Sequence, residues 1–194
     1  MRTSLDGRGT RDVLVAGAVT PPLVSPDGEW VYYADEGSGQ PRSYRVSSRG
    51  GAPEALGGEH FLPNDLSPDG AYLLCSTSDD HEQPVFAVMS LADHTVRRLR
   101  PPNITAASLR IGPRFGPGGN SVLYAAGPSG EVSALSNAGA GGASLWELRR
   151  EEETPRLVAT FDQNLFAWSL GPDGKRVLIA LGDIRTDVVL LTRQ

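Results

Sequence analysis

Three histidines and a single cysteine are the residues of this chain that most often carry nucleophilic, acid–base or metal chemistry. His60, His81 and His94 have neither the i, i+4 spacing nor the cysteine partners of a zinc site. Cys75 lies within the apolar run 72–75, which is typical of packing rather than of a reactive thiol. We therefore predict no metal site, no cofactor and no cysteine catalysis.

Three aspartates recur in the same setting and could act as metal ligands or acid catalysts. The segments 25–28 and 67–70 both read Ser-Pro-Asp-Gly, and 171–174 reads Gly-Pro-Asp-Gly. Proline presets φ for the first central position of a tight turn, aspartate favours the next, and glycine accepts a positive φ. Equivalent positions in separate repeats should also hold these carboxylates apart. We therefore interpret Asp27, Asp69 and Asp173 as turn residues.

Motifs of larger catalytic classes are absent from the sequence: there is no G-x-S-x-G elbow, kinase motif or phosphate-binding loop. The net charge of the 194 residues is −5, and the basic pairs 97–98 and 149–150 are predicted to be solvated strand edges. A nucleic-acid partner is therefore not expected. No window approaches 18 apolar residues and residues 1–10 are polar, so we expect neither membrane insertion nor a signal peptide.

The turns belong to an internal repeat, which is the strongest pattern in the chain. A weaker copy at 116–119 completes a set of four, and the closing glycines are spaced by 42, 49 and 55 residues. After each turn, successive positions are all apolar or small rather than alternately polar. Such a strand is buried on both faces, as it would be between stacked sheets. The aligned columns are Val31, Leu73, Val122 and Val177, followed by Tyr32, Leu74, Leu123 and Leu178.

A third strand follows in each unit, and a fourth, more polar strand follows in the first three. Four strands per unit predict an all-β protein, a β-propeller of four-stranded antiparallel blades. About four blades are present, either closing as a ring or forming part of a six- to eight-bladed ring. The predicted single domain is 1–194, and its blades are 18–57, 60–100, 109–159 and 163–194.

Insertions and chain ends account for the irregularities of the repeat. Residues 100–113 are expected to lengthen one connection, and 127–142, rich in Gly, Ala and Ser, are expected to form a flexible loop. Segment 12–17 is predicted to be an orphan outer strand. It has the spacing of the outer strand that the last unit, with its third strand at 187–192, lacks.

The first unit, SPDGEWVYYADEGSGQPRSYRVSSRGGAPEAL, resembles the PD-type (WD-like) repeats of the TolB-like β-propeller family. The last unit is similar to the closing blade of C-terminal propellers in large bacterial proteins, where they follow Ser/Thr kinase or winged-helix regulator domains. Gly118 and Gly171 depart from the family pattern. The resemblance implies a recognition platform with no conserved catalytic centre, and a periplasmic or otherwise cytoplasmic location.

Candidate binding residues lie where a propeller presents its channel mouth. The predicted positions are His60, Asn64, Asp65, Arg110, Arg114, Asn164 and Trp168, of which we select His60, Asp65, Arg114 and Trp168. The pair Asp65 and Arg114 either neutralises itself or binds a ligand. Trp168 either packs between blades or anchors a partner.

Two functions are compatible with these observations. The first is a non-catalytic sensor or binding module that takes a protein partner or a small ligand on a loop face. The second is the propeller portion of an enzyme, namely a hydrolase or lyase, or an accessory domain of a serine peptidase or protein kinase. A carboxylate cluster at the axis would favour the enzyme, whereas a lone Asp/Arg pair would favour binding. We also expect either a homodimer or a missing N-terminal half-propeller.

Overall fold

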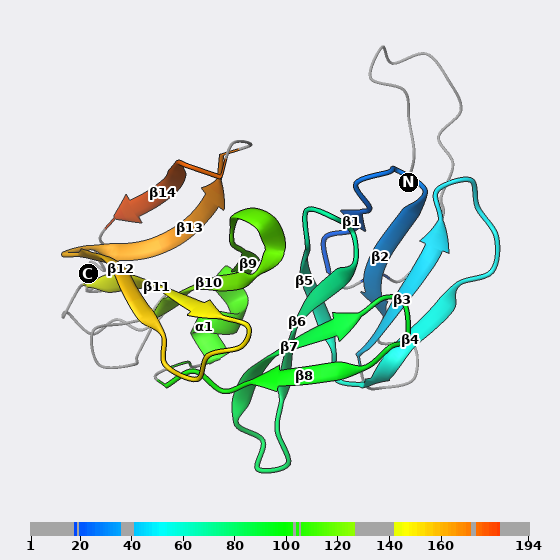
Figure 1. The fold of residues 1–194 in the computed structure, drawn as a ribbon, viewed down its shortest axis with the longest axis horizontal. Coiled ribbons are helices and arrows are strands. Elements are labelled where there is room, and N and C mark those ends of the chain that lie inside the picture. The colour runs from blue at the N-terminus through cyan, green and yellow to red at the C-terminus, as the bar shows by residue number, and fades with distance from the viewer. Residues whose placement is uncertain are drawn as a thin grey trace, which may run out of the picture.

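Four antiparallel sheets follow one another along the chain (Figure 1). The computed structural model describes residues 18, 20–35, 41–102, 104, 106–126, 142–171 and 174–182. The first sheet contains β1 (Leu23–Val24), β2 (Trp30–Asp35), β3 (Arg42–Ser47) and β4 (Glu54–Glu59). The second contains β5 (Leu62–Leu66), β6 (Tyr72–Ser78), β7 (Pro84–Ser90) and β8 (Val96–Leu99). The third contains β9 (Arg114–Phe115), β10 (Ser121–Ala126), β11 (Ala143–Arg149) and β12 (Arg156–Phe161), and the fourth β13 (Asn164–Leu170) and β14 (Val177–Gly182).

Within every sheet the strands pair in chain order, so the first strand is innermost and the last lies at the rim. The first strands of neighbouring sheets meet: β1 contacts β5, and β5 contacts β9. These strands gather near the middle of the molecule, and the other strands lead outward from them (Figure 1). The predicted all-β fold of antiparallel propeller blades is therefore confirmed.

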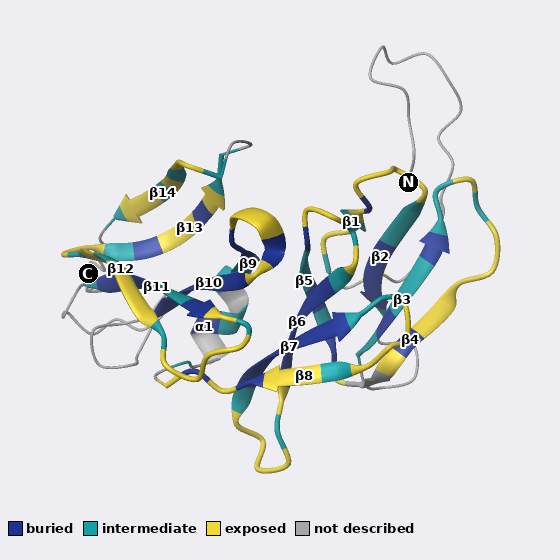
Figure 2. Ribbon diagram, in the orientation of Figure 1, coloured by how far each residue is buried: buried dark blue, intermediate teal, exposed yellow. Residues whose placement is uncertain are grey.

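The core consists of layers between successive blades. On β6, Leu73 and Cys75 pack toward the first blade, whereas Leu74 packs toward the third. All three side chains are fully buried, as the apolar columns predicted. A third cluster lies between the third and fourth blades and contains Leu123 and Trp168. Figure 2 shows the result: the second strands β6 and β10 are buried, and the rim strands β8 and β12 are largely exposed.

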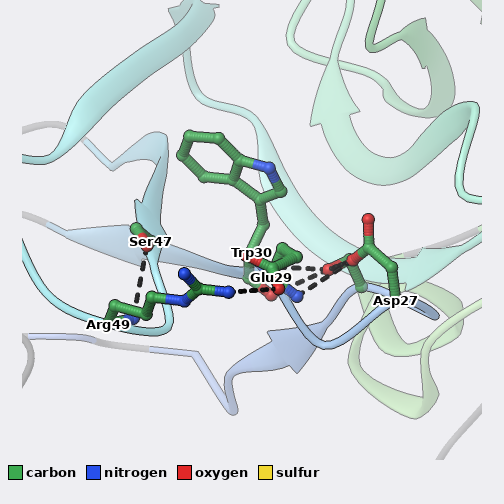
Figure 3. A network of polar contacts seen from close by, with 6 residues as sticks. Asp27, Glu29, Trp30, Ser47 and Arg49 are labelled. Atoms are coloured by element: carbon green, nitrogen blue, oxygen red, sulfur yellow. Dashed lines mark hydrogen bonds and ion pairs between the residues drawn. The ribbon is translucent and has the colours of Figure 1, made fainter.

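The Ser-Pro-Asp-Gly segments form hydrogen-bonded turns. The Ser25 hydroxyl donates to the Asp27 carboxylate at 2.5 Å and accepts from the Trp30 N–H at 2.9 Å. The same carboxylate accepts from the Glu29 N–H at 2.9 Å (Figure 3). Gly28 adopts a φ of 74°. These bonds confirm the turn interpretation for Asp27.

The second copy repeats this geometry with Ser67, Asp69 and Tyr72 in the same roles. Asp69 is therefore also a turn residue, whereas Asp173 lies outside the described residues. In the third copy a side chain on Gly116 would place its Cβ 2.2 Å from the Ser121 Oγ. A side chain at 116 would therefore force the Ser121 hydroxyl to move, which favours glycine at the start of that turn.

A short helix, α1 (Ala106–Ile111), lies where the sequence predicted only a lengthened connection. Leu109 and Ile111 pack against the core between the second and third blades, which holds the helix in place. Gly112 follows with a φ of 79°, and its N–H donates to the Ser108 carbonyl oxygen at 3.3 Å, so the helix ends in a left-handed cap. Neither α1 nor the 3₁₀ turn η1 (Pro117–Gly119), the helices of the described part of the chain, is long and apolar enough to span a bilayer.

Three predictions concern residues outside those described: the orphan strand 12–17, nearly all of the loop 127–142, and the strand at 187–192.

Candidate binding face

A β-bulge on β5 sets the position of Asp65. Pro63 pairs with Cys75 and Asp65 with Leu74, which leaves Asn64 as the extra residue. The Asn64 side-chain amide donates to the Leu62 carbonyl oxygen at 2.7 Å and to the Ser76 hydroxyl at 2.8 Å. Because the extra residue is held by two hydrogen bonds, the bulge fixes the direction in which Asp65 leaves the strand.

Asp65 and Arg114 tie β5 to β9. The Phe115 N–H donates to Oδ2 of Asp65 at 2.8 Å, and the Arg114 guanidinium donates to the backbone oxygen of Asn64. Burial raises the pKa of the Asp65 carboxyl above its ordinary value, although the Phe115 N–H and the Arg114 charge act in the opposite direction. The structure therefore brings the two residues together at the inner strands.

Beside Asp65 lies a hollow of about 350 Å³, at the end of β5 where the sequence predicted a channel mouth, and we call it the channel-mouth hollow. Asp65 is its only charged residue among the described residues that line it, and the other lining residues are apolar or glycine. They are Leu66, Pro68, Phe115, Gly116, Pro117, Gly118, Leu170, Gly171 and Gly174. These residues come from the ends of the first strands β5, β9 and β13 and from the turns that join the first and second strands of the last three sheets. We call this side of the propeller the inner-turn face.

The other predicted positions do not reach this hollow. His60 is exposed in the turn before β5, with a φ of 67°, at the opposite end of that strand from Asp65. Trp168 is 6% exposed and packs on the third blade, while its indole N–H has no hydrogen-bond partner among the described residues. Asn164 begins β13. Arg110 belongs to α1.

A larger cleft of about 1000 Å³ opens on the inner-turn face between the second and third blades. Its residues come from β6, β8 and the turn before β6 in the second blade, and from η1, β10, β11 and the turn after β11 in the third. They are Asp69, Tyr72, Arg97, Pro117, Gly118, Gly119, Asn120, Ser121, Glu147, Arg149, Arg150, Glu151 and Glu152. A further hollow of about 480 Å³ lies beside it toward the rim and includes Arg97, Arg98, Glu152 and Glu153.

Fixed polar contacts line this cleft. The Arg150 guanidinium stacks over the Tyr72 ring at 3.7 Å, and its backbone N–H donates to the Asn120 carbonyl oxygen at 2.9 Å. Glu147 accepts from the Ser121 hydroxyl at 2.8 Å and pairs with Arg156 at 2.7 Å. Arg156, with a smaller effect of Ser121, holds the pKa of Glu147 below its ordinary range. The cleft is therefore a preorganised polar surface.

Sequence reasoning missed this cleft because it interpreted the two arginine pairs separately, as solvated edges. The structure places Arg97, Arg149 and Arg150 around one opening. The available signal was positional: one pair belongs to the last strand of a blade and the other ends the third strand of the next blade. No group of three or more His, Cys, Asp or Glu side chains within the described ranges could hold a metal ion.

Proteins similar to this chain were found by structure and not by sequence. No protein-family model and no curated protein matches the sequence. A protein assigned as TolB from Agrobacterium tumefaciens has a TM-score of 0.67 at 18% identity, over 82% of this chain and 53% of that one. TolB from Acinetobacter baumannii has a TM-score of 0.63 at 15% identity, over 87% of this chain and 39% of that one.

The likeness is not restricted to TolB. Hydrazine synthase of Kuenenia stuttgartiensis has a TM-score of 0.59 at 16% identity, over 95% of this chain and 47% of that one. The chain thus spans about half the length, or less, of each of these structures. At identities this low, the likeness in structure shows the fold alone and leaves the function open. In its described residues, the chain has the β-propeller fold of the TolB structures.

Proposed function

We propose that this chain is a non-catalytic propeller module that binds a protein segment or a small ligand on its inner-turn face. The observation that carries the proposal is that the described residues of the channel-mouth hollow include a single carboxylate. Asp65 lies there beside Arg114 and the Phe115 N–H, and the other described lining residues carry no charge.

Acid–base and glycosidic chemistry generally needs two titratable groups on either side of the reacting bond. Among the described residues that line it, the hollow offers one, Asp65, and one of the two oxygens of that carboxylate already accepts the Phe115 N–H. A half-buried carboxylate among apolar and glycine residues instead favours a ligand that brings a cation or a hydrogen-bond donor. This comparison supports binding over the alternative, in which the chain is the propeller portion of a hydrolase, lyase or peptidase.

The proposal also concerns the larger protein in which such a binding module would act. We place the chain as the interaction or sensor part of a larger bacterial protein. Its likeness in fold to TolB structures, of which it spans about half or less, supports this placement.

A labelled pentapeptide with one lysine, Ala-Ala-Lys-Ala-Ala, is a direct probe, and the peptide with glutamine in place of lysine is its control. Fluorescence anisotropy should show tighter binding of the lysine peptide. Asp65→Asn should weaken that binding at least about tenfold, because a hydrogen bond to a charged group contributes about 1.5–3 kcal/mol. Asp80→Asn changes an exposed carboxylate in the turn between β6 and β7 and should have no effect.

Equal affinity of the wild type and Asp65→Asn would refute the proposal. So would cleavage of the peptide by the wild type that is lost in Asp65→Asn, because that result would assign Asp65 to catalysis. A thermal melt of each variant separates loss of binding from loss of folding.

A further inference from the structure

One position on the second strand of each blade packs against the blade that follows. It is the fourth residue after the closing glycine of the turn, and Tyr32, Leu74, Leu123 and Leu178 occupy it. Tyr32 belongs to the core cluster between the first two blades, Leu74 to the next cluster and Leu123 to the last. These three side chains are at most 6% exposed. We call the side of a blade that carries this position its forward face.

The forward face of the fourth blade is uncovered. Leu178 is 69% exposed, although it occupies the position that is sealed in the other three blades. Along β14 the residues alternate between partly buried and exposed, whereas β6 and β10 are buried on both faces (Figure 2). The strand therefore packs on the third blade with one face and meets solvent with the other.

A phenylalanine enlarges this exposed surface. Phe166 is the extra residue of a β-bulge in β13 and is 42% exposed. Its ring lies over Gly182, where an added Cβ would be 3.1 Å from the ring. The ring therefore lies on the same face as Leu178, since alternate residues of β14 share a face. The described residues of this forward face are Phe166, Ala167, Ser169, Leu178, Ala180 and Gly182.

This composition is unusual for the last unit of a stack. Terminal repeats generally carry a polar outer face, because no further repeat covers them. None of the described residues on the forward face of the fourth blade is charged, and the two largest are Phe166 and Leu178. Such a face matches the interior of the propeller, and we expect another apolar surface to cover it.

The opposite end of the stack is already covered. On the first blade, Val46 is fully buried and Tyr33 is 3% exposed, and both lie on the side turned away from the second blade. Tyr33 also stacks on Tyr44, with ring centroids 5.6 Å apart. A head-to-tail contact between two copies would need this side to be open. An isologous contact uses the same face of both copies, and a face without charge can meet itself without repulsion.

We propose that two copies of this chain associate through the forward faces of their fourth blades, with Leu178 and Phe166 of each copy at the centre of the contact. The association covers the apolar side chains that the fold leaves in solvent. Neither residue lines the channel-mouth hollow, so this proposal does not depend on the binding function proposed above.

Sedimentation equilibrium over a wide range of protein concentration tests the association. The wild type should show a monomer–dimer equilibrium. Leu178→Glu should raise its dissociation constant at least about a hundredfold, because the symmetric contact would bury the unpaired charge twice. Val24→Glu is the control and should have no effect, because Val24 is an exposed apolar residue of β1 on the first blade.

A mixing experiment tests whether the contact joins two identical faces. Leu178→Glu and Leu178→Lys should each be monomeric alone. In an isologous dimer the two substituted faces meet, so an equimolar mixture at low salt should associate at least about tenfold more tightly than either variant by itself. If the mixture stays as monomeric as its components, the same-face contact is wrong.

The remaining outcomes are equally decisive. A wild type that stays monomeric at every concentration overturns the proposal and leaves the face to another partner. Masses that grow beyond two chains overturn the isologous arrangement, since head-to-tail contacts do not close at two copies. Thermal melts show whether each variant folds. If Leu178→Glu melts early, the milder Leu178→Ser should still weaken the dimer about tenfold, and no weakening would refute the role of Leu178.

Discussion

Replacing Ser67 by alanine tests the turn that defines the repeat. The Ser67 hydroxyl is fully buried, donates to the Asp69 carboxylate at 2.5 Å and accepts from the Tyr72 N–H at 2.9 Å. Alanine removes both bonds and leaves the Tyr72 amide without this acceptor. Each bond contributes about 0.5–1.5 kcal/mol, so Ser67→Ala should lower the free energy of unfolding by about 2 kcal/mol.

The pH dependence of that loss provides a second readout. The Ser67 hydroxyl, followed by the Ala71 N–H, holds the pKa of Asp69 below its ordinary value. A carboxyl whose pKa is lowered on folding stabilises the protein above its unfolded pKa, and this stabilisation disappears as the pH falls through the folded value. The difference between the wild type and Ser67→Ala should therefore narrow below about pH 4, and the part due to the Tyr72 amide should remain.

Urea unfolding at about pH 7 and at about pH 3.5 measures both effects. Ser169→Ala is the control, because Ser169 is exposed and its hydroxyl makes only a long contact of 3.4 Å. A loss below about 0.5 kcal/mol at neutral pH would refute the claim that the serine organises the turn. A difference that does not change with pH would refute the role assigned to the Asp69 carboxylate.

Two further predictions concern the core. Burial raises the pKa of the Cys75 thiol to about 12. Ellman's reagent should therefore modify Cys75 in the native protein at least about a hundredfold more slowly than in the urea-unfolded chain. Rapid labelling of the native protein would contradict the burial of Cys75. Gly57 has a φ of 63°, and an added Cβ would lie 2.5 Å from the buried Met89 Cε. Gly57→Ala should therefore lower the free energy of unfolding in urea by about 1–3 kcal/mol more than Gly28→Ala does. Gly28→Ala is the control, because an added Cβ there meets nothing within 4 Å. Equal losses would show that the contact with Met89 relaxes freely.

The repeat could be predicted from sequence because its physical cause is local. A strand buried on both faces has no solvent-facing positions, so 73–75 is apolar throughout, and the turn before it needs Pro-Asp-Gly. The helix α1 could not be predicted in this way. It has six residues, too few to show a period, and it is held by contacts of Leu109 and Ile111 with other blades.

The binding face depends on contacts between blades. Asp65 and Arg114 were recognised because they are polar residues at the predicted innermost strands, but the Asn64 bulge that directs Asp65 has no local signature beyond Pro63. Arg97 and Glu152 are far apart in sequence and share a cleft only because their blades stack. Sequence reasoning that treats each blade separately does not detect such a site.

The central claim is that ligands bind on the inner-turn face. A ¹H–¹⁵N correlation spectrum of the labelled protein, titrated with the pentapeptide Ala-Ala-Lys-Ala-Ala, tests it residue by residue. The backbone amides of Leu66, Gly116 and Gly118, which line the hollow beside Asp65, should shift and saturate together. Shifts confined to the turn at 79–83, at the other end of the second blade, or no shifts at all, would contradict the claim.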